Sequence, residues 1–184
     1  MGRALIVVDV QNDFCEGGSL PVSGGAALAQ KLNDLTASGA YDAVVATRDF
    51  HIDPGDHFSQ TPDFATSWPP HCRVGTPGAD FHPDFDLTPV AAVFSKGEYS
   101  AAYSGFEGAC ADGTTLASWL QKRDLDSVDV VGIATDHCVA ATARDAARQG
   151  LHTRVLTAYA VGIEEQSINR ALGKLRAAGV KVVR

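Results

Sequence analysis

The sequence predicts a three-layer α/β/α fold built on a doubly wound parallel sheet. Two observations predict it: six short runs rich in valine and isoleucine recur along the chain, and helical patterns separate them. The runs do not alternate cleanly between apolar and polar residues, which is typical of strands buried on both faces of a parallel sheet. Strands that alternate with helices form βαβ units, and such units assemble into a doubly wound sheet.

Each predicted element follows from its local pattern. The six apolar runs predict strands at residues 4–10, 43–47, 90–95, 128–133, 154–158 and 180–183. Four amphipathic or alanine-rich segments predict helices, marked in chain order by Leu28, Leu32 and Leu35, by Leu116, Trp119 and Leu120, by residues 138–149, and by Ile168, Leu172 and Leu175. Gly150 and Gly179 follow the last two of these segments, where glycine commonly ends a helix.

Length and composition narrow the class of protein. The 184 residues fit a single domain that spans 1–184, and the net charge of -7 disfavours binding to nucleic acid or to an anionic membrane. The apolar run near the N-terminus is too short to cross a membrane and lacks the layout of a secretory signal, so we expect a cytoplasmic location. The four cysteines include no C-x-x-C pair, which disfavours a disulfide framework.

One connection interrupts the alternation of strands and helices. Residues 48–89 hold most of the prolines and four of the six histidines. A connection of this length inside a compact domain is usually functional. Ionisable residues also follow several predicted strands, and the carboxyl ends of parallel strands meet at one edge of a sheet, where ligands bind. We therefore expect Asp9, Asp49, Lys96, Asp136 and Cys138 to gather at this edge.

These strand ends supply a nucleophile, a cation and a base. Cys138 stands where a strand ends and a predicted helix begins, and a helix start lowers the pKa of a thiol. Lys96 adds a positive charge, and Asp9 can accept the thiol proton. The alternative is a buried core cysteine beside an unrelated ion pair. His137 is not expected to be the base, because neighbouring helical residues point to different faces.

The stretch RDFHIDPGDHF, residues 48–58, carries candidate metal ligands. Asp49 and His51 lie two residues apart at a strand end, so their side chains point the same way in an extended chain. The turn DPG bends the chain back before His57, and His71 follows two prolines. One carboxylate and up to three imidazoles suit a divalent ion such as zinc, iron or manganese. A solvated acidic loop is the alternative, and spacing alone leaves both open.

Five motifs, in order along the chain, resemble the isochorismatase-like family of cysteine hydrolases: IVVDVQNDF, DFHIDPGDHFS, WPPHC, KG with AYSGFEG, and VGIATDHCV. The resemblance runs from residue 3 to about residue 160. It implies a six-stranded parallel sheet flanked by helices. It also implies that Cys138 is the nucleophile and that Asp9 and Lys96 complete a catalytic triad.

The resemblance implies the rest of a site as well. The metal ligands would be Asp49, His51 and His71, with His57 binding directly or through water. A cis peptide between Ile133 and Ala134 would orient the amides of Ala134 and Cys138 as an oxyanion hole. The pocket for a flat aromatic ring would be lined by Phe14, Leu20, Trp68 and Tyr103.

The implied activity is hydrolysis of nicotinamide to nicotinate and ammonia, and of pyrazinamide to pyrazinoate, through a cysteine thioester. One divalent ion (iron, zinc or manganese) would hold the ring nitrogen of this small aromatic amide. Two alternatives stay open: a related cysteine amidohydrolase acting on another small amide, and a non-catalytic protein that senses metal or redox state. The sequence also leaves the oligomeric state open, and a monomer is compatible with it.

Overall fold

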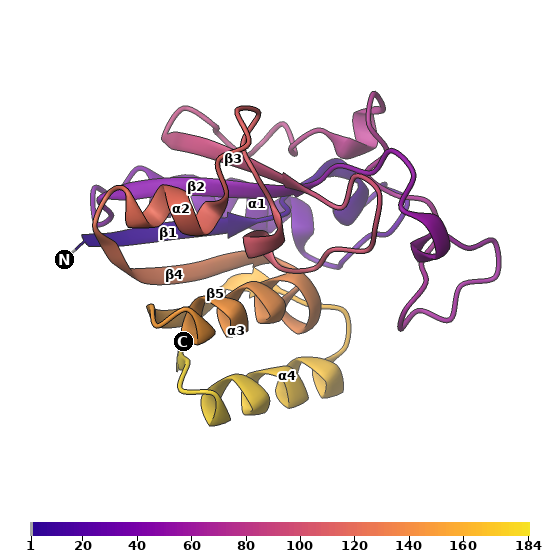
Figure 1. Cartoon of the computed structure of the whole chain (residues 1–184). Coiled ribbons are helices and arrows are strands. Elements are labelled where there is room, and N and C mark those ends of the chain that lie inside the picture. Colours follow the sequence, from indigo (N-terminus) through magenta and orange to yellow (C-terminus); the bar gives the residue numbers. More distant parts are fainter. Residues whose placement is uncertain (1) are drawn as a thin grey trace.

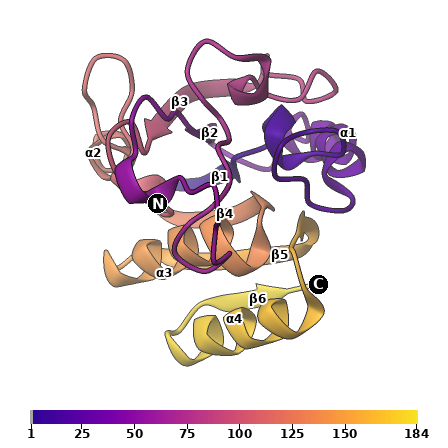
Figure 2. The same cartoon turned by 90° about the vertical axis from the view of Figure 1, so that its right-hand side faces the viewer.

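All six predicted strands lie in one parallel sheet, in the order β3-β2-β1-β4-β5-β6 (Figures 1 and 2). The computed structural model describes residues 2–184. Each strand begins or ends within a few residues of its predicted bounds, and the strands are β1 Gly2–Val8, β2 Ala43–Asp49, β3 Val90–Lys96, β4 Leu125–Ile133, β5 His152–Val161 and β6 Lys181–Val183.

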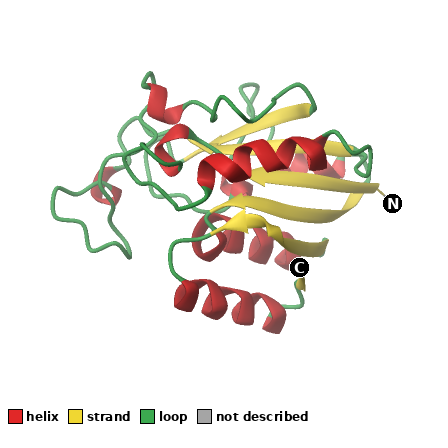
Figure 3. Cartoon of the chain, turned by 180° about the vertical axis from the view of Figure 1, so that it is seen from behind, coloured by secondary structure: helices red, strands yellow, loops and turns green. Residues whose placement is uncertain are grey.

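The helices cover both faces of the sheet, as predicted. They are α1 Gly25–Thr36, α2 Leu116–Gln121, α3 Ala140–Arg148 and α4 Glu165–Ala177. Helix α1 lies on one face, seen from behind in Figure 3, and the other three lie on the opposite face (Figures 1 and 2). Gly150 and Gly179 have φ of 83° and 85°, so they end α3 and α4 in the left-handed conformation that glycine adopts readily.

Strand β1 shows why the apolar runs do not alternate with polar residues. Its even-numbered side chains, such as Ile6, belong to the core under α2, α3 and α4. Its odd-numbered side chains, such as Leu5, belong to a second core under α1 together with Leu28 and Leu32. Both faces of the strand are therefore buried, and each large aliphatic side chain contributes about 1.5–3 kcal/mol to stability.

One fully buried carboxylate ties three strands together away from the carboxyl edge. Asp129 in β4 accepts hydrogen bonds from Arg3 Nη1 at 2.7 Å, from Tyr41 Oη at 2.9 Å and from Arg154 Nε at 2.6 Å. Burial opposes the charge, but the hydrogen bonds from Arg154 and Tyr41 hold the pKa of Asp129 below its usual value. Asp129 therefore serves the sheet as an ionised carboxylate.

The strands all point toward the same edge, and the long connection between β2 and β3 projects from that edge (Figure 1). This connection contains short 3-10 turns at Gly55–His57 and Pro77–Ala79. Within residues 2–184, no helix combines the length and the apolar character needed to cross a membrane.

Candidate active site and metal centre

Lys96 is the centre of a buried cluster of charges. Its Nζ lies 2.9 Å from Asp9 Oδ2 and 3.6 Å from Cys138 Sγ, and it also contacts Asp49 Oδ1. Asp49 and Lys96 are paired residues at the ends of β2 and β3, and Asp9 follows β1. Parallel pairing therefore brings three residues together that are far apart in the sequence. The predicted grouping of Asp9, Lys96 and Cys138 agrees with this geometry.

Asp9 is held with one carboxylate oxygen directed at the cluster. Its backbone has a φ of 51°, and its amide donates to the Thr47 carbonyl at 3.1 Å. The Thr47 hydroxyl donates to Asp9 Oδ1 at 2.6 Å. Oδ2 lies near Lys96 but receives no well-aligned hydrogen bond from a nitrogen or oxygen of the described residues. That oxygen is available to the Cys138 thiol.

The two carboxylates beside Lys96 have pKa values shifted in opposite directions. Burial and the nearby charge of Asp49 raise the pKa of Asp9, against the opposing effect of Lys96. Burial also opposes ionisation of Asp49, but the ammonium of Lys96 holds its pKa well below the usual value. Asp49 is thus a permanent anion, whereas Asp9 is suited to take up and release a proton. Burial disfavours charge on Lys96, yet Asp49 and Asp9 raise its pKa well above normal, so it stays an ammonium.

The prediction that a helix start would lower the pKa of the Cys138 thiol is wrong. Burial raises its pKa well above the usual value, and the carboxylates of Asp9 and Asp49 add to that effect, while Lys96 opposes them. Cys138 lies in a π-helical turn, Thr135–Val139, and α3 begins only at Ala140. The resting group is therefore a thiol that must pass its proton to a base as it reacts.

The backbone before Cys138 has the geometry that the motif GIATDHC implied. The peptide between Ile133 and Ala134 is cis. The amides of His137 and Val139 both donate to the Ala134 carbonyl, at 3.0 and 3.1 Å. The amide of Ala134, by contrast, donates no hydrogen bond to any residue of the described range 2–184. A free N–H group beside a nucleophile is what an oxyanion hole requires.

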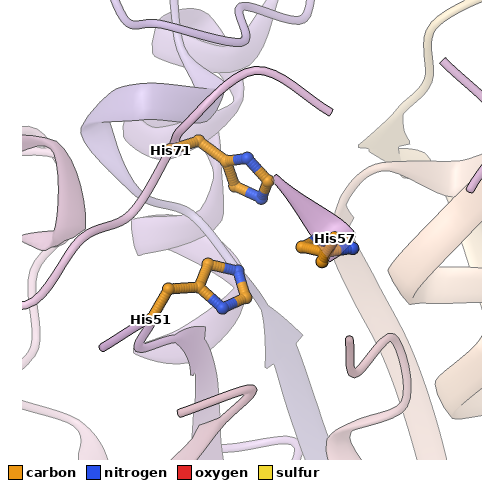
Figure 4. A group of neighbouring side chains, drawn as sticks. All are labelled: His51, His57 and His71. Atoms are coloured by element: carbon orange, nitrogen blue, oxygen red, sulfur yellow. The ribbon is translucent and has the colours of Figure 1, made fainter. Parts of the chain in front are cut away.

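Three imidazoles lie close together beyond the end of β2 (Figure 4). His51, His57 and His71 are all buried, and each offers a ring nitrogen within 4.8 Å of the others. The Nδ1 atoms of His51 and His71 donate to the carbonyls of Gly97 at 2.6 Å and Pro69 at 2.8 Å, so their Nε2 lone pairs are free to bind a metal.

The unpaired nitrogens of this cluster fit a divalent cation. His51 Nε2 and His57 Nδ1 are buried without a hydrogen-bond partner among the described residues. Asp49 Oδ2 lies 3.5 Å from His51 Nε2 and 3.6 Å from His71 Nε2. Burial and the neighbouring histidines lower the pKa of His57 to about 4, so its ring is neutral near pH 7. Neutral imidazoles beside a carboxylate form a ligand set for zinc, iron or manganese.

A single pocket joins this cluster to Cys138. The four side chains predicted to line it, Phe14, Leu20, Trp68 and Tyr103, all do so, as do His57, His71 and Ala134. Trp68 Nε1 donates to Tyr103 Oη at 3.0 Å, which fixes the two rings relative to each other. Asp9 and Lys96 are fully or almost fully buried behind the pocket floor. The pocket therefore offers a mostly apolar space between a nucleophile and a candidate metal centre.

Sequence reasoning misplaced one residue and missed others. Asp136, expected at the site, turns away and accepts hydrogen bonds from the Ile163 amide at 3.1 Å and from the Ser167 hydroxyl. His137, set aside as a base, lines the pocket with its ring 5.1 Å from Trp68, edge-on. Sequence reasoning missed Gln11, whose side chain contacts the Asp49 backbone. The only indication of its role in the sequence is its position within the motif IVVDVQNDF.

Comparisons with known proteins agree with this geometry. The chain is 62% identical to the nicotinamidase/pyrazinamidase of Mycobacterium tuberculosis, over 98% of each chain. Among solved structures, it resembles the pyrazinamidase of Pyrococcus horikoshii in complex with zinc, with a TM-score of 0.82 and 38% identity over 100% of this chain and 99% of the other. It also resembles PnC1 of L. infantum in complex with nicotinate, with a TM-score of 0.87 and 31% identity over 100% and 92%.

The family itself is settled by a match along nearly the whole chain. Residues 3–184 match the family model described as the isochorismatase domain. The match extends past residue 160, where the recognisable motifs end, and covers every strand except the first residue of β1. The resemblance predicted from the five motifs is confirmed: the chain belongs to the isochorismatase-domain family.

Proposed function

We infer that this chain is a metal-dependent nicotinamidase, which hydrolyses nicotinamide to nicotinate and ammonia and pyrazinamide to pyrazinoate. The observation that carries the substrate is the 62% identity, over 98% of both chains, to a nicotinamidase/pyrazinamidase. The chemistry is supported by Cys138 Sγ lying 3.6 Å from Lys96 Nζ at the floor of an aromatic pocket.

Asp9 would act as the base and then as the acid. As Cys138 Sγ bonds to the carboxamide carbon, its proton passes to Asp9 Oδ2, whose raised pKa suits it to accept one. The carbon–nitrogen bond then breaks, and Asp9 gives that proton to the leaving nitrogen, which departs as ammonia. Asp9 next takes a proton from water, whose hydroxyl attacks the thioester. Cys138 leaves as the thiol when the proton returns to it, and the product is a carboxylic acid.

Lys96 and two backbone amides would stabilise the charges that form on the way. The Lys96 ammonium, 3.6 Å from Cys138 Sγ and 2.9 Å from Asp9 Oδ2, offsets negative charge on either partner. The amides of Ala134 and Cys138 would donate to the oxyanion of the tetrahedral intermediate, and the Ala134 amide has no other acceptor among the described residues. The Lys96 ammonium and the backbone amides act in a buried site, where a hydrogen bond to a charge is stronger than in water.

We propose that Asp49, His51, His57 and His71 hold one divalent ion, zinc, iron or manganese. When bound, this ion supplies a Lewis acid that holds the ring nitrogen of the substrate. The apolar pocket walls, including Phe14 and Trp68, would orient the ring so that its carboxamide faces Cys138. An amidohydrolase for a non-aromatic amide has no need of three converging imidazoles, and a sensor protein would release no ammonia.

Benzamide tests the substrate assignment, because it has the ring and the scissile bond of nicotinamide but no ring nitrogen. It should fit between Phe14, Trp68 and Tyr103. Its kcat/KM should nevertheless be lower than that of nicotinamide by roughly 10²-fold or more, since one polar anchor is lost in a buried site. Ammonia release from both amides and from pyrazinamide measures this. Equal values for benzamide and nicotinamide would contradict ring anchoring and leave the cysteine chemistry intact.

Metal content tests the histidine cluster. The purified protein should carry about one divalent ion per chain by elemental analysis. His71→Ala should lose most of it, because one of three buried ring nitrogens is removed, whereas His152→Ala, on an exposed histidine, should keep it. Binding should weaken as pH falls, since protons compete for imidazole, and His57 joins this competition only as pH approaches its pKa of about 4. Full activity in metal-free protein would refute the site.

A further inference from the structure

Gln11 is a fully buried polar side chain that the proposed reaction does not use. It lies two residues beyond Asp9, and all of its hydrogen-bonding groups point into the protein. Oε1 accepts from the Asp49 amide at 2.8 Å, and Nε2 donates to the carbonyls of Asp49 and Ala79, each at 2.8 Å. Both protons of the amide and one acceptor position are therefore occupied, which leaves this side chain little freedom.

These bonds replace the strand pairing that ends just before Asp49. The last paired residues of β1 and β2 are Val8 and Thr47. Beyond them the β1 chain turns at Asp9, and no β1 backbone reaches Asp49. The Gln11 carboxamide, which has the donor and acceptor of a peptide group, binds the Asp49 backbone in place of a neighbouring strand. On its other side, Asp49 pairs with Lys96 of β3.

The backbone that Gln11 holds carries the anion of the candidate metal centre. Asp49 Oδ2 lies 3.5 Å and 3.6 Å from the ring nitrogens of His51 and His71. A side chain binds a metal ion well only when its ligand atom lies within about 0.5 Å of the position that the coordination geometry requires. The third bond, to Ala79, also ties this strand end to the turn Pro77–Ala79 in the segment that follows His71. Gln11 thus connects the strand end that carries Asp49 to the segment that follows His71.

We propose that Gln11 is a positioning residue that sets the metal affinity of this centre by holding the Asp49 backbone. The proposal rests on the proposed function, because it assumes a metal at the three histidines and Asp49. Changes to residues that orient metal ligands typically cost 10–100-fold in affinity. A side chain that merely fills space would lower the stability of the fold and leave metal affinity unchanged.

The test measures Zn²⁺ affinity of metal-free protein by competition with a chromophoric chelator, together with the melting temperature. Gln11→Met keeps the length and removes the amide, and Gln11→Asn keeps the amide but is too short to span both partners. Each should bind Zn²⁺ roughly 10–100-fold more weakly than the wild type. Asp129→Asn is the matched control: it weakens a buried hydrogen-bonded carboxylate of β4, so it should lower the melting temperature with Zn²⁺ affinity unchanged.

The outcomes separate this proposal from the proposed function. Wild-type Zn²⁺ affinity in a folded Gln11→Met protein, or in Gln11→Asn if the first variant does not fold, overturns the role of Gln11 while leaving the metal centre in place. A wild-type chain that binds no Zn²⁺ overturns the metal centre and the role of Gln11 together. An equal loss of affinity in Asp129→Asn also overturns the proposal, because affinity would then follow stability alone.

Discussion

Replacing Cys138 by alanine is expected to remove turnover of nicotinamide, with kcat at least about 10⁴-fold lower, because the reaction then has no nucleophile. The side chain is 8% exposed and small, so the fold should survive the loss of one sulfur. Ammonia release measures the activity, circular dichroism measures the fold, and mass spectrometry of the quenched wild-type enzyme should detect the acyl adduct on this residue.

Cys110→Ala is the control for that experiment. Cys110 is partly buried and lies outside the pocket, so it is not placed to attack a substrate bound there. The Cys110→Ala variant should keep wild-type activity, and so should Cys15→Ala. In the wild type, burial and the nearby Glu16 raise the pKa of the Cys15 thiol to about 11. If Cys138→Ala retained a tenth of normal turnover, Cys138 would not be the nucleophile.

Asp9→Asn should lower kcat/KM by roughly 10³–10⁴-fold, which corresponds to about 4–5.5 kcal/mol of transition-state stabilisation. The change keeps the size of the side chain and its contact with the Thr47 hydroxyl but removes the group that accepts the thiol proton. The loss should be large because the pKa of Cys138 is raised by burial, so very little thiolate forms without a base. Steady-state kinetics with nicotinamide provide the measurement.

An exposed acidic residue provides the comparison for Asp9→Asn. Asp56 lies in the turn Gly55–His57, near the candidate metal ligands, and its side chain is exposed. Asp56→Asn removes the same charge, so it should leave kcat/KM within about twofold of the wild type if position rather than overall charge matters. Activity of Asp9→Asn within tenfold of the wild type would show that another group accepts the proton.

Most of the fold was predictable because its signals are local. A run such as 43–47 is mostly apolar and does not alternate, and a strand with both faces buried has this pattern wherever it sits in the sheet. The order of the strands, with β1 in the middle between β2 and β4, is a property of the assembled sheet. Repeated apolar runs do not encode which strand lies next to which.

Part of the candidate site was predictable for a related reason. Because parallel strands end at one edge, ionisable residues after β1, β2 and β3 had to lie near one another, and Asp9, Asp49 and Lys96 do. The motifs then pointed to Cys138 and the three histidines. Asp136 follows the same strand as Cys138 but turns toward Ser167, because the direction of a side chain depends on the backbone conformation at its own position.

The sequence by itself therefore determined the elements, the family and the set of chemical groups at one edge of the sheet. Only the tertiary structure decided how these groups behave: burial, not a helix start, sets the direction of the Cys138 pKa shift, and Asp9 and Asp49 are shifted in opposite directions around one ammonium. It alone revealed that Gln11 binds the Asp49 backbone across the end of the sheet. Propensity and periodicity act over a few neighbouring residues, whereas desolvation and hydrogen bonds between distant segments exist only once the chain has packed.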